Sequence, residues 1–594
     1  MISPFVLRML RWRVRLAEAL RPGELQATLF WAGVAGFAGA LVSYLFRELA
    51  TGLHWLLTLK SEAVISSLGN LPTWELVVIP AWGGLTAGAI IQFGMRILKG
   101  QSSTDFMEAI SLGQGVIRFR STLIKSISSL VTIASGGSIG REGPMVQLSS
   151  MLASVIGRKI HLSTPRLQLL VACGAAAGIA SAYNAPIAGA LFVGEIALGS
   201  IAMESFGPLV FASVISTVTT GQLLGAGPVF EAPLFRLASS FELAFYVCLG
   251  LAAGLLAPGF LVLLERTESL FSRLPWPLCL RMALGGLILG LIGLLRPGQI
   301  NGNGYTVIDH ILNHRELSGA LASLLVLKLL ATAATVGSGA VGGVFTPTLF
   351  VGAALGCLFG NLVQGLGHAW VASPSAYALV GMGCFLAGTT HAPIMAILMV
   401  FEMTRDYTIV PPLMLACVTA HYTSQGIRKN SIYASSLRRK RQAEGVVITD
   451  RTVGELMKPK PLSVLDTARF DEIANTFVAN RNNYLYVTNS EGRFIGAISL
   501  HDIKTYLTDP DLATLVIASD FLRESFPFLT PGSKLTEALE AFSRHDGERL
   551  PVLESVESRN LIGYISKTDL LLTLAYRGGE REPATAGRGG MVRT

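Results

Sequence analysis

Charged residues are scarce in this chain of 594 residues, because Asp, Glu, Lys and Arg together supply only 14 % of it. Soluble domains carry about a quarter, and the mean hydropathy here is +0.53. A soluble fold is therefore excluded for most of the sequence, which we expect to lie in lipid. Six apolar stretches reach the roughly 20 residues that one bilayer crossing needs: residues 27–57, 76–94, 206–229, 241–264, 317–336 and 408–427.

Cysteine is also infrequent, and its pattern excludes two kinds of site. The six cysteines stand singly in apolar segments, without the spacing of a disulfide framework or of metal ligands. We therefore interpret them as small apolar side chains and expect neither disulfides nor a metal centre. They are Cys173, Cys248, Cys279, Cys357, Cys384 and Cys417.

Two further features are missing around the basic segment at residues 1–24. No small-residue cleavage site follows it, so a removable signal peptide is not expected. No basic–aromatic recognition module accompanies the net charge of +8, which excludes nucleic acid as a partner. The arginines of this segment and the basic run at 438–441 instead predict that both ends are cytoplasmic and contact anionic lipid.

The sequence does contain an internal repeat. Residues 135–147 (SGGSIGREGPMVQ) align with 338–350 (SGAVGGVFTPTLF) at a separation of 203, and 184–195 (NAPIAGALFVGE) align with 391–402 (HAPIMAILMVFE) at 207. Each copy breaks an apolar stretch with Gly and Pro. Two such halves are typical of secondary transporters and channels, whose substrate site lies between the repeats near the bilayer midplane.

The first copy carries an ionisable residue, Glu142, within the break at 140–144 (GREGP). A charged carboxylate at mid-membrane costs about 2.5–3.5 kcal/mol. Pro144 favours a helix start, whose free N–H groups lower that cost and also bind small anions. We therefore predict that Glu142 competes with an anion and acts as its gate. A plain capping role is the alternative, although the second copy places Phe345 at the matching position.

The second copy, residues 342–347 (GGVFTP), supplies the rest of the predicted site. Its glycines let the backbone N–H groups of Val344 and Phe345 face a ligand, and such partial charges bind a conducted anion only moderately. Arg141 either joins this site or pairs with a carboxylate elsewhere. The candidates for anion binding in the two breaks are Gly140, Arg141, Gly143, Gly343, Val344 and Phe345.

Beyond Asn430 the chain changes to mixed-charge, alternating sequence with its own repeat. GAISLHDIKTYL (496–507) recurs as GYISKTDLLLTL (563–574), and each copy predicts a strand followed by a helix. This tail resembles a tandem pair of CBS domains, which the resemblance places at 452–510 and 519–576. We expect a linker at 438–451 and a disordered tail at 577–594.

The resemblance to CBS domains also implies a ligand for the tail. The family's ribose-contacting positions correspond to Ser499, Asp502, Ser566 and Asp569. A carboxylate at such a position accepts hydrogen bonds from both sugar hydroxyls. The resemblance therefore implies binding of an adenine nucleotide, and a purely structural pair that binds nothing is the alternative.

The motifs GREGP, GSGAVGGVFTP, NAPIAG and SIYASSL, followed by the CBS-like pair, resemble the CLC family of chloride channels and proton-coupled chloride exchangers. The resemblance covers residues 25 to about 440. It implies an all-α polytopic membrane protein, with inverted halves at about 25–229 and 240–430 in a transmembrane domain ending at 437, plus a cytoplasmic α/β CBS tandem. It also implies a homodimer in the bacterial inner membrane that carries chloride or similar small anions, needs no cofactor and is not an enzyme.

The same resemblance assigns roles to single residues. Glu142 becomes the external gate, and Tyr433 offers its hydroxyl to the central anion. The family's first anion motif, Gly-Ser-Gly-Ile-Pro, is replaced by residues 100–105 (GQSSTD), as in a bacterial subgroup. Ser102 and Ser103 are the candidates there.

Two questions about function remain open in the sequence. Ile196 occupies the position where exchangers of the family often carry a proton-relay glutamate, which favours a voltage- or pH-gated chloride channel. A proton/chloride antiporter is the alternative. A remote alternative is an intramembrane serine hydrolase, because Ser138 lies in a Gly-x-Ser-x-Gly pattern and His391 is available as a base. Glu195 and Glu402 match each other across the repeats, so we interpret both as structural.

Overall fold

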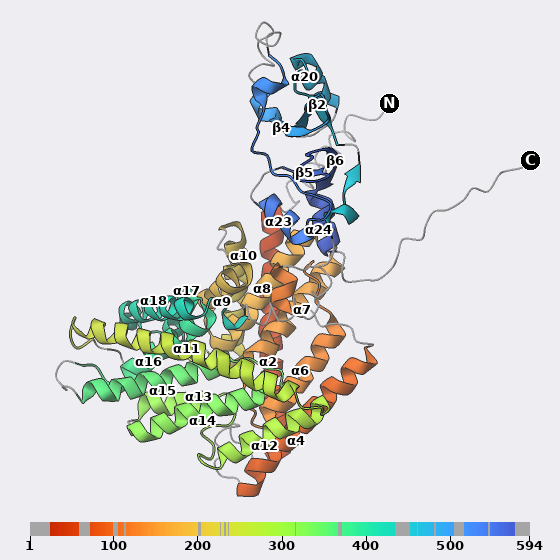
Figure 1. Cartoon of the computed structure of the whole chain (residues 1–594). Helices are drawn as coiled ribbons and strands as arrows, with labels where there is room; N and C mark the ends of the chain where they lie inside the picture. Colours follow the sequence, from red (N-terminus) through yellow and green to blue (C-terminus); the bar gives the residue numbers. More distant parts are fainter. Residues whose placement is uncertain are drawn as a thin grey trace, which may run out of the picture. The chain divides into compact units, whose positions relative to one another are not determined.

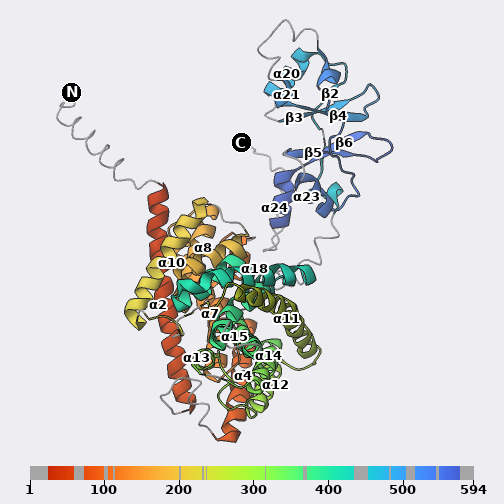
Figure 2. The ribbon, with the colours of Figure 1, turned by 90° about the vertical axis from the view of Figure 1, so that its left-hand side faces the viewer.

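The computed structural model forms two compact units, Met1–Leu437 and Arg438–Thr594, drawn in two orientations in Figures 1 and 2. The basic segment before Glu24, the expected linker at 438–451 and the expected tail at 577–594 lie outside the described residues. The structure describes residues 24–58, 72–98, 105–111, 114–199, 203–225, 227–230, 233, 235, 237–314, 316–365, 371–433, 452–459, 461–479, 483–503, 516–543 and 547–575.

The described part of the first unit is helical. Its elements are α2 (Glu24–Thr58), α4 (Thr73–Ile97), α5 (Phe106–Ser111), α6 (Phe119–Ala134), α7 (Glu142–Lys159), α8 (Thr164–Tyr183), α9 (Pro186–Phe192), the π-helix η1 (Val193–Leu198), α10 (Met203–Leu224), α11 (Glu242–Ser272), α12 (Leu278–Gly293), α13 (Tyr305–Asn313), α14 (Ser318–Gly337), α15 (Phe345–Gln364), α16 (Pro374–Thr390), α17 (Pro393–Thr404), η3 (Tyr407–Ile409) and α18 (Val410–Ile427).

Seven of the described helices are long and apolar enough to cross a membrane. Five of them correspond to predicted stretches, and the sixth stretch forms the 18-residue helix α18. The prediction missed α8 and α15. Both are rich in Gly and Ala and lie mostly inside the protein, so their sequences are less uniformly apolar than those of lipid-facing helices.

The two halves repeat helix by helix, as the doubled pattern predicted. Helices α7 and α15 begin at Glu142 and Phe345, which are 203 positions apart. Helices α9 and α17 both begin with Pro, 207 positions apart. The residues that end α8 and α16, Asn184 and His391, share a left-handed backbone with φ of 54° and 58°. Local conformation therefore follows the repeat even where the side chains differ.

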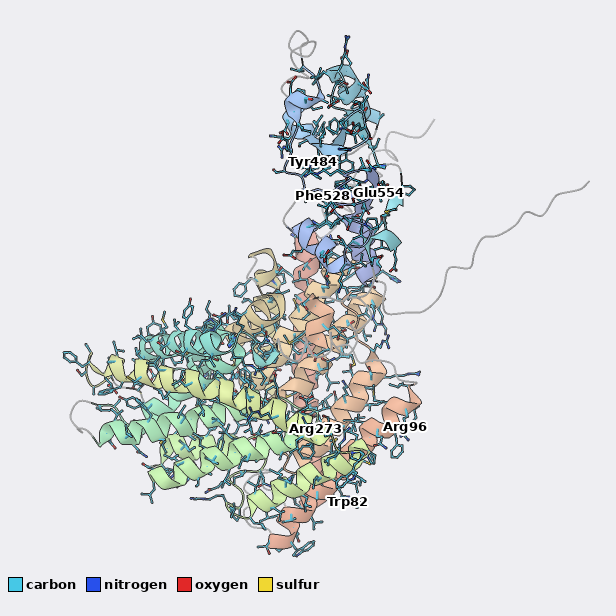
Figure 3. All side chains as sticks on the ribbon, in the orientation of Figure 1. Trp82, Arg96, Arg273, Tyr484, Phe528 and Glu554 are labelled. Carbon is cyan, nitrogen blue, oxygen red and sulfur yellow. The ribbon has the colours of Figure 1, made fainter. Side chains whose placement is uncertain are left out.

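Large apolar side chains cover the outside of this unit. Trp82 on α4 is 60 % exposed, and Arg96, in the last turn of the same helix, is exposed as well. Arg273 is a second exposed charge, at the end of α11 (Figure 3). Apolar side chains along a helix with charges at its end are the pattern of a helix that faces lipid and ends near water.

Neighbouring helices approach closely through glycine. Helices α15 and α16 pack along each other, and a Cβ added to Gly381 would lie 2.2 Å from the Gly352 carbonyl oxygen. A Cβ on Gly352 would in turn lie 2.4 Å from the Gly381 oxygen. Because backbone meets backbone here, no side chain can move aside to make room. Small residues give membrane helices this approach.

The described residues of the second unit form two three-stranded sheets, in the orders β1-β6-β5 and β2-β3-β4. Its elements are η4 (Val453–Glu455), β1 (Lys458–Pro459), β2 (Ser463–Leu465), α20 (Phe470–Ala479), β3 (Tyr484–Thr488), β4 (Phe494–Ser499), α21 (Leu500–Ile503), η6 (Ala518–Phe521), α23 (Leu535–Ser543), β5 (Arg549–Leu553), β6 (Leu561–Ser566) and α24 (Lys567–Ala575).

The two halves of this unit exchange their first segments. Strand β1 opens the first half but pairs with β6 of the second, with Lys458 opposite Tyr564. A bridge between Arg523 and Ala497 joins the start of the second half to β4 of the first. Each half is therefore completed by the other.

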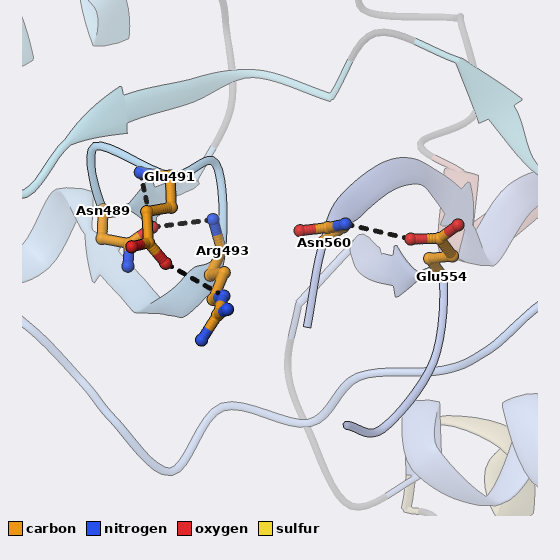
Figure 4. Close-up of polar contacts among 5 residues, drawn as sticks. All are labelled: Asn489, Glu491, Arg493, Glu554 and Asn560. Carbon is orange, nitrogen blue, oxygen red and sulfur yellow. Dashed lines mark hydrogen bonds and ion pairs between the residues drawn. The ribbon is translucent and has the colours of Figure 1, made fainter. Parts of the chain in front are cut away.

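The turns that follow β3 and β5 also meet. Asn489 Oδ1 accepts hydrogen bonds from the N–H groups of Glu491 and Arg493 (Figure 4), at 3.1 and 2.8 Å. In the second turn Asn560 donates to Glu554 over 3.0 Å. A bridge between Arg493 and Asn560 links the two turns. The repeated turns thus fix the halves against each other.

We expect Gly381→Ala to destabilise the first unit by about 1–3 kcal/mol, because the new methyl group overlaps the backbone of α15. Thermal unfolding of the purified protein in detergent measures the effect. Gly259→Ala in α11 is the matched control, because nothing lies within 4 Å of its added Cβ. Equal melting temperatures for the two variants would contradict tight α15–α16 packing.

Candidate anion site

The two glycine-rich breaks pair directly with each other. Gly140 N–H donates to the Gly343 carbonyl over 2.6 Å, and Gly343 N–H donates back to the Gly140 carbonyl over 2.9 Å. Gly140 and Gly343 are 203 positions apart, so they are equivalent residues of the two motif copies. The bridge therefore joins one copy of the motif to the other. The predicted candidates Gly140, Arg141, Gly143, Gly343, Val344 and Phe345 are brought together at this bridge.

Glu142 lies buried against the bridge, with only 2 % of its surface exposed. Its Oε1 accepts hydrogen bonds from the hydroxyls of Thr346 and Tyr305, the latter over 3.4 Å. A Cβ on Gly140 would lie 1.8 Å from Glu142 Oε2, and one on Gly343 would lie 3.0 Å from it. The two glycines therefore make the space that the carboxylate fills.

The second carboxylate oxygen differs from the first. Glu142 Oε2 is buried and has no hydrogen-bond partner among the described residues. A buried polar oxygen without a partner costs about 1–3 kcal/mol. In this position, one of the two carboxylate oxygens therefore adds no hydrogen bond to offset the cost of burying the side chain.

The other side of the bridge supplies backbone donors at a helix start. Phe345 opens α15, and Val344 precedes it. Neither N–H donates to the backbone of another described residue, and the first N–H groups of a helix carry its partial positive charge. Phe345 is itself buried. The arrangement offers a negative ligand two donors without a full positive charge.

A chain of aromatic rings links Tyr433 to this centre. The Tyr433 ring meets Phe192 edge-on at a centroid distance of 5.6 Å, and Phe192 meets Phe345 at 6.4 Å. Phe345 lies 4.9 Å from Tyr183, which in turn contacts Tyr305 at 6.5 Å. Tyr433 is therefore connected to the Glu142 environment through ring contacts.

Arg141 does not pair with a carboxylate among the described residues. Its guanidinium carbon lies 5.0 Å from the centre of the Tyr305 ring. This is a cation–π contact, which is worth about 0.5–2 kcal/mol depending on exposure. Arg141 thus touches the same tyrosine that donates to Glu142.

The predicted serines of the first anion motif, Ser102 and Ser103, lie outside the described residues. The chain is described again from Asp105, and Phe106 N–H donates to Gln147 Oε1 of α7 over 2.9 Å. The Phe106 ring stacks with Phe192 at 6.3 Å. The residues that follow this motif thus reach the same aromatic chain as Tyr433.

Glu195 and Glu402 cap one helix each in the opposite half. Glu402 accepts from the N–H groups of Ile187 and Ala188 at the start of α9, over 3.0 and 2.8 Å. Glu195 accepts from the N–H groups of Ile394 and Met395 at the start of α17, over 3.3 and 2.7 Å. The expected structural role of this pair is confirmed. Ile196 follows Glu195 in η1 and packs against the core.

The serine-hydrolase alternative lacks its base. Ser138 is buried, and its hydroxyl hydrogen-bonds to Thr332 over 3.1 Å. The ring of His391 instead hydrogen-bonds to Ser424 over 3.4 Å. A nucleophile needs a base within hydrogen-bond reach, and among the described residues Ser138 and His391 are each hydrogen-bonded to a different partner.

In the tail, basic residues already occupy both candidate ribose-binding carboxylates. Asp502 accepts a bidentate pair of hydrogen bonds from Arg523, at 2.7 Å each. Asp569 receives Lys458 Nζ at 2.6 Å and the Ser566 hydroxyl at 2.6 Å. Each basic residue comes from the opposite half, so the ion pairs repeat the exchange of the first segments.

These ion pairs shift the charge equilibria of the tail. Hydrogen bonds from Lys458 and then Ser566 hold the pKa of Asp569 below its ordinary 3.8. A carboxylate with a lowered pKa adds stability above its ordinary value and loses it as pH falls through the lowered one. Ser566 also caps α24 by accepting from Asp569 N–H over 3.0 Å, and Ser499 accepts from His501 N–H over 3.2 Å. Both candidate serines therefore have structural bonds.

The sequence analysis missed Tyr305 and Thr346, the two donors to Glu142. Thr346 directly follows Phe345 in the second motif, so its position next to a predicted ligand was a usable signal. Tyr305 opens α13 after a glycine-rich turn that belongs to neither repeated motif. Only the folded chain brings it to the gate.

Fold and site together define a class: a helical membrane protein of two related halves that meet at a buried carboxylate, followed by a paired α/β tail. Residues 83–425 match the family model of the voltage gated chloride channel, and residues 453–509 and 518–576 match that of the CBS domain. The chain therefore belongs to the voltage gated chloride channel (CLC) family and carries a CBS pair, as its motifs predicted.

Individual relatives agree with this assignment. The chain is 47 % identical over 414 residues to a ClcB-like chloride channel protein of Ralstonia nicotianae, covering 69 % of this chain and 96 % of the relative. It is 40 % identical over 424 residues to the voltage-gated ClC-type chloride channel ClcB of Citrobacter koseri, covering 68 % and 97 %. The matches span nearly the whole of both relatives.

Solved structures confirm the predicted fold class. A slow cyanobacterial Cl⁻/H⁺ antiporter matches with a TM-score of 0.63 at 24 % identity, over 70 % of this chain and 97 % of that one. A eukaryotic CLC transporter matches with a TM-score of 0.61 at 17 % identity, over 91 % and 97 %. At such identities the similarity shows the fold and does not indicate the transport mechanism.

We expect Glu402→Gln to lower the stability of the first unit by about 1–3 kcal/mol, because the amide keeps one acceptor and leaves one N–H in the first turn of α9 unpaired. Thermal unfolding measures the loss, and Glu195→Gln should cost a similar amount through α17. A Glu402→Gln protein of unchanged stability but altered pH dependence of transport would contradict the capping role.

Proposed function

We propose that the protein conducts chloride or a similar small anion across the bacterial inner membrane, as a homodimer, with Glu142 as its gate. The observation that carries the proposal is the place of the Glu142 carboxylate. It fills the space between Gly140 and Gly343, the residue just before Val344 and Phe345 at the start of α15, and one of its oxygens has no partner among the described residues. A carboxylate there stands where a small anion would bind.

Gating then follows from charge. An ionised Glu142 fills the space between the two breaks and repels an anion there, since both are negative. Protonation removes that repulsion, and the anion takes the place of Oε2 between the two breaks. Thr346 and Tyr305 hold Oε1 in the closed position, so both hydroxyls oppose opening. Tyr433 contributes its hydroxyl further along the pathway, together with Ser102 and Ser103.

The same proposal favours a channel over a proton/chloride antiporter. Ile196 cannot carry a proton, and Glu195 beside it is engaged as a helix cap. An antiporter needs a second proton pathway to the cytoplasmic side. The proposed topology places both termini in the cytoplasm, with the transmembrane domain at 25–437.

For the tail we propose that its two halves, 452–510 and 519–576, bind an adenine nucleotide. Asp502 and Asp569 would accept hydrogen bonds from the ribose hydroxyls, with Ser499 and Ser566 beside them. Binding must first displace Arg523 and Lys458 from these carboxylates. The freed basic groups would then lie close to the phosphates of the nucleotide.

Reversal potentials test the proposed function. Purified protein in planar bilayers under a chloride gradient should reverse at the chloride Nernst potential, without proton movement. Uphill proton transport driven by the chloride gradient would establish the antiporter instead. Absence of any chloride current or flux would refute anion transport altogether.

We expect Glu142→Gln to conduct chloride with no dependence on external pH, because the amide cannot be ionised. Chloride efflux from vesicles at pH 4.5 and pH 7.5 measures this directly. Wild-type flux should rise at the lower pH, where the carboxylate becomes neutral. A variant that keeps the wild-type pH dependence would refute the gate assignment.

ATP or AMP should raise the melting temperature of the tail in the full-length protein, by the linkage between ligand binding and stability. Asp502→Ala and Asp569→Ala should abolish the increase. Asp471→Ala is the control, because Asp471 is an exposed carboxylate in the first turn of α20. An unchanged melting temperature in the wild type would favour a purely structural pair.

A further inference from the structure

A cavity of about 460 Å³ lies beside the proposed gate, and two arginines line it. Its volume falls within the roughly 300–1,000 Å³ of small-ligand sites. Arg47 enters from α2 and Arg141 from the loop before α7, and no carboxylate is among the described residues that line the cavity. Thr51, Asn184 and Asn303 add neutral polar groups to the wall. The cavity is therefore strongly positive.

The positive charge of this cavity is not paired within it, although Glu48, which lies outside the cavity, acts electrostatically on Arg47. Neither Arg47 nor Arg141 forms an ion pair with another described residue, and Arg141 Nε is buried without a hydrogen-bond partner. The two charges are also close enough to act on one another. Two half-buried cations that share a cavity repel each other, and an anion between them removes that cost.

The chemistry of guanidinium indicates which anion fits. Each guanidinium is a planar fork that matches the paired oxygens of a carboxylate, sulfate or phosphate with two parallel hydrogen bonds. A chloride ion presents no such pair of atoms. A cavity with two forks therefore discriminates in favour of a small oxyanion, in contrast to the backbone donors at Val344 and Phe345.

One side chain connects this cavity to the gate. Tyr305 lines the cavity, carries Arg141 against its ring at 5.0 Å and donates its hydroxyl to Glu142 Oε1 over 3.4 Å. A ligand that draws Arg141 toward Arg47 changes the support of that tyrosine. A ligand in the cavity would therefore act on the Glu142 carboxylate through Tyr305.

We propose that the cavity binds a small oxyanion from water, of the sulfate or phosphate class, between Arg47 and Arg141, and that the bound oxyanion reduces anion flux. The binding step stands on the cavity alone, whereas the effect on flux rests on the proposed function of Glu142. The site differs from the conducting one in its donors, which are side-chain cations and not backbone groups, and Arg141 borders both.

Thermal unfolding of the purified protein tests binding without transport. Sodium sulfate should raise the melting temperature above that in sodium chloride of equal ionic strength. Arg47→Gln should raise the half-effective sulfate concentration about tenfold, the loss expected for one charge-assisted bond, and Arg47→Lys should recover part of it. Arg273→Gln, the same change at an exposed arginine outside the cavity, should behave as wild type. No sulfate effect, or one that ignores Arg47→Gln, would overturn the site.

Chloride flux from vesicles tests the consequence. Sulfate added on the side of the cavity should inhibit wild-type flux, and inhibition of Arg47→Gln, scaled to its own flux, should need about tenfold more sulfate. Equal inhibition of both would overturn the proposal while transport stands. Sulfate binding through Arg47 without any chloride flux would refute the proposed function and keep the site. Dioctanoyl phosphatidic acid that binds at lower concentration than sulfate or phosphate would overturn the free oxyanion as ligand.

Discussion

The pair of hydrogen bonds between Gly140 and Gly343 is the contact on which the site depends. It joins the two glycine-rich breaks backbone to backbone, so the helices that start there, α7 and α15, are held with their first turns at one place. No side chain takes part, and therefore the bridge survives differences between the two motifs. It also leaves a space without Cβ atoms, which the Glu142 carboxylate fills. The position of the proposed gate is a consequence of this pairing.

Around that bridge the protein combines symmetric support with an asymmetric centre. Glu195 and Glu402 make the same two hydrogen bonds to helix starts of opposite halves. Both carboxylates accept hydrogen bonds from the N–H groups of helix starts, so they are poor candidates for carrying protons. Glu142 and Phe345 occupy equivalent positions but differ completely in chemistry. The proposed gate lies where the two copies of the repeat differ, and the helix caps lie where they agree.

Much of this arrangement could be predicted from the sequence, because the repeated motifs fix helix starts by Gly and Pro alone. The equivalence of Glu142 and Phe345 and the matched pair Glu195 and Glu402 follow from that pattern, and the fold class follows from the resemblance that the motifs carry. The helices α8 and α15 were missed as spans, since their many small residues dilute the apolar signal. Contacts made by segments outside the repeated motifs also leave no signal in the sequence. Tyr305 reaches Glu142, and Arg47 reaches the cavity beside Arg141, only through tertiary folding.

The exchanged first segments of the tail have a mechanical consequence. Strand β1 is the first strand of the tail, yet it is hydrogen-bonded within the sheet of the second half. Tension that enters the tail through the preceding chain is therefore borne at once by β6, while Lys458 transmits it to Asp569. The first half is joined to the second again near its other end, where Asp502 accepts two hydrogen bonds from Arg523. Under an applied force, the two halves of the tail would therefore unfold together, at one unfolding force.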